Sequence, residues 1–126
     1  MKALHIVESA YRATIEEQDD TIVWLTQAMR GAGATVDLLL RGNAVNYAVR
    51  GQDARGLEFG AWKQTEPPRI ERDLASLIAK GGSVYALGDD LEQRGLEGAA
   101  LVEGVRPLPM PMLPAFLAGY DRVWHW

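Results

Sequence analysis

The sequence predicts an α/β domain of three layers, in which helices cover both faces of a mostly parallel sheet of about five strands. Two observations carry this prediction. Short apolar runs alternate with helical patterns of about 10 to 15 residues, which is typical of right-handed crossover units. The 126 residues are also enough for one core, because a chain of this length buries roughly two thirds of its unfolded surface. Residues 1–126 are therefore expected to form a single domain.

The first third of the chain reads as strand, helix, strand and short helix. Residues 2–8 are compact and apolar, as in a central parallel strand. A helix is predicted from about Glu16 to Arg30, where apolar residues recur at helical spacing, and the glycine at Gly31 ends it. Residues 35–40 form the second strand. Asn43 is expected to cap a short helical segment through its side-chain oxygen.

The middle of the chain contains the least regular segment. Residues 51–65 lack sustained periodicity and hold three glycines, so a loop is predicted. A loop of this length in a compact domain is typical of a binding loop, a lid or an interface. The dipeptide Pro67-Pro68 is expected to open the next helix, because a missing amide costs least in the first turn. Residues 83–87 form the third strand, and a helix of one or two turns follows.

The last part of the chain is rich in proline and then aromatic. Residues 102–108 are expected to hold a fourth, short strand. Prolines then favour an extended path and a final helix that is entered at Pro114. Residues 120–126 close the chain as a strand whose aromatic side chains alternate between its two faces.

Composition excludes several classes of function. The net charge of −4 offers no basic footprint for nucleic acid or an anionic membrane, and the apolar runs are too short to span a bilayer. The chain has no cysteine, so neither a disulfide framework nor a zinc cluster can be built. The N-terminal residues read as a strand rather than a signal peptide, and a cytoplasmic location is expected.

Three polar groups follow the first three predicted strands, at residues 8–12, 42–46 and 88–90. Ligands of open parallel sheets bind beyond the carboxyl ends of the strands, so these groups are expected to form one rim. The candidate ligand-binding residues are Tyr11, Asn43, Asn46, Tyr47, Gly88 and Asp89.

Catalytic and metal-binding roles are weighed against simpler ones. Asp89 and Asp90 are interpreted as the cap and first turn of a helix rather than as ligands of a cation, so no metal and no cofactor are predicted. His5 lies within a central strand, where a hydrogen-bonded core histidine is favoured over a general base. No catalytic residue is assigned.

Large aromatic side chains outside the helical stripes point to association. The candidate interface residues are Trp62, Trp124, His125 and Trp126. Aromatic residues are enriched at association hot spots, and a small protein has limited core to receive them. For Trp124, packing beneath the last helix is an equally good explanation.

Three segments together carry a resemblance to a known family. In the first segment, Val84 to Leu96, the pattern Leu-x-x-Arg-Gly-Leu follows an apolar strand and a short turn. The other two are the turn Gly42-Asn43-Ala44-Val45 and the ending from Ala118 to Val123, and all three have the order and spacing found in one family. The chain thus resembles the DsrE/DsrF/DsrH (TusD/TusB-like) small sulfur-relay proteins. The resemblance implies a DsrE-like fold, assembly as homotrimers, homohexamers or mixed hexamers, and a persulfide-carrying cysteine at the position of Leu87, which joins the candidate rim.

Leucine at position 87 argues against the family's chemistry, because only a thiolate can attack and carry the sulfur. We therefore expect no sulfurtransferase activity from this chain alone. Two functions remain open. The first is a non-catalytic structural, regulatory or partner-binding subunit in sulfur trafficking or oxidation. Such a subunit would assemble with copies of itself and with a cysteine-bearing sulfur carrier. The second is a protein that binds a small anion, or an uncharacterised enzyme, with its pocket at the strand ends.

Overall fold

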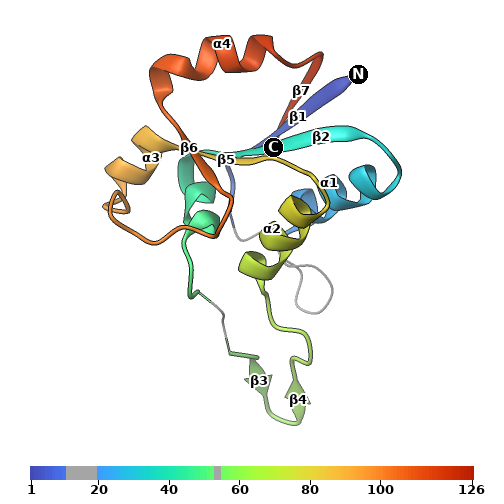
Figure 1. Ribbon diagram of the computed structural model, residues 1–126. Helices are drawn as coiled ribbons and strands as arrows, with labels where there is room; N and C mark the ends of the chain where they lie inside the picture. Colours follow the sequence, from blue (N-terminus) through green and yellow to red (C-terminus); the bar gives the residue numbers. More distant parts are fainter. Residues whose placement is uncertain (11–19, 53–54) are drawn as a thin grey trace.

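The computed structural model describes residues 1–10, 20–52 and 55–126, and its centre is one five-stranded sheet (Figure 1). Every pair of neighbouring strands is parallel, and the spatial order is β6-β5-β2-β1-β7. The strands are β1 (Lys2–Val7), β2 (Thr35–Leu40), β5 (Val84–Leu87), β6 (Arg106–Leu108) and β7 (Arg122–His125). The predicted α/β class with a parallel sheet is confirmed.

Helical segments cover both faces of the sheet. One face carries α1 (Thr21–Gly31), α2 (Ile70–Ala79), the 3₁₀ segment η1 (Gly42–Ala48) and α3 (Gly88–Gln93). The other face carries the 3₁₀ segment η2 (Met110–Met112) and α4 (Leu113–Ala118), which lies above the sheet in Figure 1. Among the described residues, no helix has the length and apolar character that crossing a membrane requires.

Two apolar layers fill the spaces between the sheet and the helices. Successive residues of a strand point to opposite faces, so β1 contributes Val7 to the layer under α1 and α2, and Leu4 to the layer under α4. Leu74 of α2 packs in the first layer and Phe116 of α4 in the second. A sheet that is apolar on both faces explains why its strands read as continuous apolar runs.

The helices begin later than the sequence predicts. Asp20 is extended (φ −153°, ψ 131°) and caps α1, because its Oδ1 accepts hydrogen bonds from the amides of Ile22 and Val23. Helix α1 therefore starts at Thr21, and Asp20 of the predicted helix is not helical; residues 16–19 of the prediction lie outside the described residues. Helix α2 likewise starts at Ile70, after the two prolines rather than at them.

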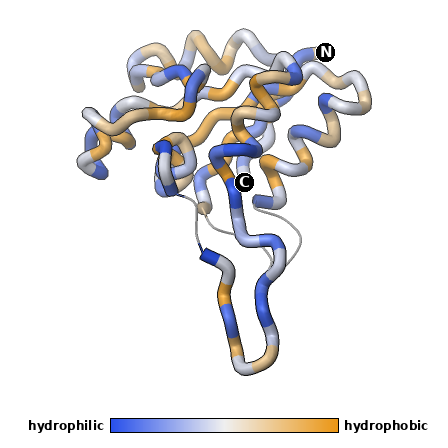
Figure 2. The backbone as a smooth tube through the Cα atoms, turned by 60° about the horizontal axis from the view of Figure 1, so that its bottom comes forward, coloured by the Kyte–Doolittle hydropathy of each residue, from blue (hydrophilic) through white to orange (hydrophobic). Residues whose placement is uncertain are grey.

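The segment predicted as a loop contains a small antiparallel hairpin, so the loop prediction is wrong for residues 58–63. Strands β3 (Glu58–Phe59) and β4 (Trp62–Lys63) are joined by a two-residue turn, and Gly60 at its first position has φ +58°, which glycine adopts without strain. The hairpin projects away from the sheet and its helices (Figures 1 and 2). We call residues 56–64 the arm.

Candidate functional site

The carboxyl ends of the strands form one edge of the sheet, where the candidate rim was predicted. Gly88 and Asp89 open α3 directly after β5, and Asn43 and Asn46 lie in η1 directly after β2. The structure therefore brings these four residues to the same edge. Tyr11 lies outside the described residues.

The polar groups of the rim bind one another. The Gly42 amide donates to Asp90 Oδ2 (2.6 Å), and the Met110 amide donates to Asp89 Oδ1 (2.8 Å). These bonds tie α3 to the loops after β2 and β6. The two aspartates do lie in the first turn of α3, as predicted, but no side chain caps this helix. Their carboxylates hold neighbouring loops together instead.

Asn43 does not cap the short helix, contrary to the sequence prediction. Residue Arg41 occupies the cap position of η1 without a side-chain hydrogen bond. Asn43 Oδ1 instead accepts from Arg94 Nη2 (3.0 Å), and its carbonyl accepts from Asn46 Nδ2 (2.8 Å). Tertiary contact with α3 thus decides the direction of this amide.

Tyr47 belongs to the core and not to the rim. Only 2% of the residue is exposed, and its hydroxyl donates to Asp20 Oδ2 (2.8 Å) at the start of α1. The short helix η1 turns this ring inward, where it packs in the layer under α1 and α2. A ligand at the surface cannot touch it, so its assignment to the rim is wrong.

Leu87 lies at the end of β5 but is completely buried. It packs with Leu4 of β1, Leu39 of β2 and Leu108 of β6 in the layer under α4. The position to which the resemblance assigns a sulfur-carrying thiol is therefore an apolar core position in this protein. Leu87 cannot form part of an exposed rim.

The strand order has its switch point between β1 and β7, and an ionisable pair lies there. His125 Nε2 and Glu8 Oε2 are 2.6 Å apart, and both side chains are about half exposed. The Glu8 amide also donates to the carbonyl of Trp126. Sequence reasoning placed Glu8 at the rim and His125 in an interface, but it missed their pairing because 117 residues separate them.

His5 is a core histidine, as the sequence predicts. Its Nδ1 lies 2.8 Å from Thr26 Oγ1, and the Thr26 hydroxyl donates to the Ile22 carbonyl (2.7 Å). Because that hydroxyl proton is already engaged, Thr26 accepts from His5 Nδ1–H. Burial lowers the pKa of His5, which favours the neutral ring.

The two C-terminal tryptophans, Trp124 of β7 and Trp126 just after it, contact the ring of His5. The ring centroid of Trp124 lies 5.3 Å from that of His5, and the centroid of Trp126 lies 5.9 Å away, both with edge contacts. Trp124 therefore packs on the His5 face of the sheet and not beneath α4, and each tryptophan keeps more than a third of its surface exposed.

The lowered pKa of His5 predicts a loss of stability in mild acid. The unfolded chain takes up a proton near pH 6.5, whereas the folded chain resists it, so the free energy of unfolding falls as the pH drops below about 6.5. Urea unfolding of the wild type and of His5→Gln at pH 7.5 and 5.5 measures this effect. We expect the pH dependence to shrink in His5→Gln but to persist in the matched variant His125→Gln. An equal dependence in all three proteins would contradict the assignment.

The part of the chain that the structure describes holds no cluster of three or more histidine, aspartate or glutamate side chains that suits a metal ion. The polar groups at the strand ends thus form hydrogen bonds between neighbouring loops, together with the exposed pair of His125 and Glu8.

These features define a class of small parallel α/β proteins with polar loops at the strand ends, and comparison with solved structures gives the particular fold. The YchN protein of E. coli is 22% identical, with a TM-score of 0.75 over 100% of both chains. MTH1491 from Methanobacterium thermoautotrophicum, a protein of unknown function, is 16% identical, with a TM-score of 0.59 over 98% of this chain and 96% of its own. No protein-family model and no curated protein matches the chain. The chain has the fold of YchN, which confirms the predicted α/β architecture with a parallel sheet between two layers of helices.

Proposed function

We propose that this protein is a non-catalytic, partner-binding subunit in sulfur trafficking or oxidation. It assembles with itself as a trimer or hexamer in the cytoplasm and binds a cysteine-bearing sulfur carrier. A single observation carries the proposal: the chain keeps a DsrE/DsrF-like fold but has a fully buried leucine where the resemblance puts the reactive thiol.

The chemistry of sulfur relay supports a non-catalytic role. A persulfide forms when a thiolate attacks a sulfur donor, and the thiolate must be reachable by donor and acceptor in turn. Leu87 offers neither a nucleophile nor access, and the whole chain has no cysteine. A thioether such as that of the exposed Met112 cannot carry a second sulfur in this reaction. Retention of the fold without the thiol is what a structural or regulatory subunit requires.

The test is sulfur uptake by single-cysteine variants, for which the cysteine-free wild type is an ideal background. After incubation with a persulfide donor, mass spectrometry should find no added sulfur on the wild type. The variant Leu87→Cys should also stay unmodified while folded, because position 87 is buried, and should react once urea unfolds it. Met112→Cys, at an exposed position, is the matched control and should react at once.

Sulfur uptake by the wild type would overturn the non-catalytic role, and fast reaction of folded Leu87→Cys would overturn the burial argument. Native mass spectrometry of the protein recovered from its own cells tests the partner. A mixed complex with a cysteine-bearing carrier is the expected result, and recovery of the chain without such a carrier would contradict it.

One observation favours the second function, a small-anion site at the strand ends. Arg41 follows β2 directly, and its Nε is buried without a hydrogen-bond partner among the described residues. An anion such as sulfate or a small carboxylate would supply the missing acceptor. Calorimetric titration of sulfate into the wild type and into Arg41→Gln measures this binding. Heat that is the same in both proteins would exclude a role for Arg41.

A further inference from the structure

We infer that the arm packs its apolar face against the exposed strand β7 of a second copy of this chain. This inference rests on the proposed self-assembly and deepens it, because it names the two surfaces that meet. Three steps lead to it: the arm has one apolar face, that face is uncovered, and β7 offers the matching uncovered surface.

The arm is amphipathic. Phe59 pairs with Trp62 across the two strands, and their ring centroids lie 5.7 Å apart. Leu57 precedes Phe59 by two residues and therefore points to the same face. The opposite face is ionic, because Glu58 pairs with Lys63 at 3.6 Å. Sheets with this alternation bury their apolar face against another element.

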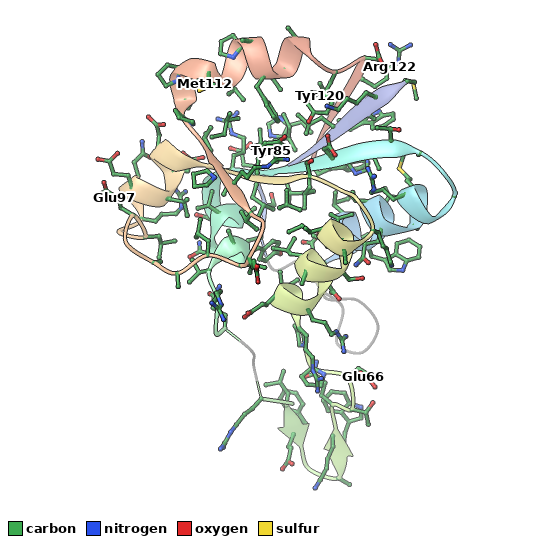
Figure 3. The ribbon with its side chains drawn as sticks, viewed as in Figure 1. Glu66, Tyr85, Glu97, Met112, Tyr120 and Arg122 are labelled. Atoms are coloured by element: carbon green, nitrogen blue, oxygen red, sulfur yellow. The ribbon has the colours of Figure 1, made fainter. Side chains whose placement is uncertain are left out.

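The body of the protein does not cover the apolar face of the arm. Leu57 is 52% exposed, Phe59 64% and Trp62 37%. Figures 1 and 2 show the arm extending away from the sheet, and Figure 3 shows its side chains standing free of the helices above. Two strands of two residues are marginal by themselves in water, so packing against another surface would stabilise the arm considerably.

Strand β7 is an uncovered sheet edge. Among the described strands it pairs with β1 alone, and all four of its residues are exposed. Val123 is 41% exposed, and the tryptophans at positions 124 and 126 are 38% and 39% exposed. An exposed edge with apolar side chains is a site for pairing with another chain, and native proteins usually protect such edges.

A second copy that receives the arm on β7 covers both surfaces at once. Within one chain the two cannot meet, because the arm points away from the body while β7 lies in the sheet (Figure 1). A fully exposed aromatic side chain presents about 150–250 Å² of surface. Multiplied by the exposed fractions given above, the large apolar side chains expose on the order of 300 Å² on the arm and a similar area around β7. An arm-to-arm contact would leave β7 open.

The contact is heterologous, because two different surfaces meet. A heterologous contact forms a ring when the rotation between neighbouring copies closes and an open filament when it does not, and the proposed trimer or hexamer corresponds to a closed ring. In a ring each chain gives one arm and receives another. Every chain then takes part in two contacts. A specific interface buries about 1,200–2,000 Å², so main-chain atoms and polar side chains around the apolar surfaces contribute the remaining area.

The test uses two variants that each damage one surface. Phe59→Asp charges the arm, and Val123→Lys charges the edge of β7. In sedimentation velocity, the wild type should be oligomeric, and each variant alone should associate at least about tenfold more weakly. An equimolar mixture should form dimers, because the intact arm of Val123→Lys fits the intact edge of Phe59→Asp. Glu58→Gln, on the ionic face of the arm, is the matched control and should remain oligomeric.

Each other outcome overturns the inference. An oligomeric Val123→Lys beside a monomeric Phe59→Asp would indicate an arm-to-arm contact. A mixture that stays monomeric, with both variants folded by circular dichroism, would exclude the heterologous contact. A monomeric wild type that still copurifies with a sulfur carrier would remove the inference and leave the proposed function. Sulfur uptake by an oligomeric wild type would overturn the proposed non-catalytic function and leave the inferred contact between the arm and β7.

Discussion

Replacing Asp37 with alanine is expected to lower the free energy of unfolding by about 3–5 kcal/mol, the range for breaking a buried, paired charge. Asp37 lies within β2 and is 4% exposed. It accepts hydrogen bonds from the Ser83 amide (3.0 Å) and the Tyr120 hydroxyl (2.8 Å) and lies 3.8 Å from Arg30 and 3.6 Å from Lys2. The substitution therefore removes one acceptor that four residues share, and it leaves the partly buried Ser83 amide and Tyr120 hydroxyl without this partner.

Urea unfolding of Asp37→Ala and of Tyr120→Phe measures this effect. Burial and the hydrogen bond to Asp37 raise the pKa of Tyr120, so its hydroxyl stays protonated and keeps donating. Tyr120→Phe removes only that bond and should cost about 1 kcal/mol. A loss in Asp37→Ala no larger than the loss in Tyr120→Phe would show that the other three contacts contribute nothing.

Replacing Asp20 with alanine is expected to cost about 3 kcal/mol, the sum of a lost helix cap and a lost buried acceptor. One carboxylate oxygen caps α1 through the amides of Ile22 and Val23, and the other accepts from the Tyr47 hydroxyl. Asp20 is 1% exposed, so water does not replace these bonds in the folded protein.

A double-mutant cycle separates the two roles of Asp20. Tyr47→Phe removes the hydroxyl and keeps the cap, so it should cost about 1 kcal/mol. Asp20→Ala combined with Tyr47→Phe should cost less than the sum of the single variants, because each single variant already removes the hydrogen bond between the two residues. Strict additivity would indicate that the hydrogen bond between the two residues adds nothing.

The candidate site was predicted in part. The strand ends follow from local patterns, and these placed Asn43, Asn46, Gly88 and Asp89 at one edge of the sheet. The contacts of these residues with distant loops could not be predicted, since they depend on which strands become neighbours. The arm was missed for a different reason: Gly60 followed by Ala61 between two aromatic residues is a hairpin signal, but the glycines of this segment were interpreted as those of a loop.

The sequence by itself determined the architecture of this protein and the absence of a sulfur-carrying thiol. Apolar periodicity and glycine or proline breaks are local, so they fixed the five strands, and composition alone excludes a cysteine. Only the tertiary structure decided that Leu87 is buried, that Tyr47 turns inward and that Glu8 meets His125. The physical reason is that the orientation of a short helix and the pairing of distant strands are set by packing across the whole sheet, which no local pattern records.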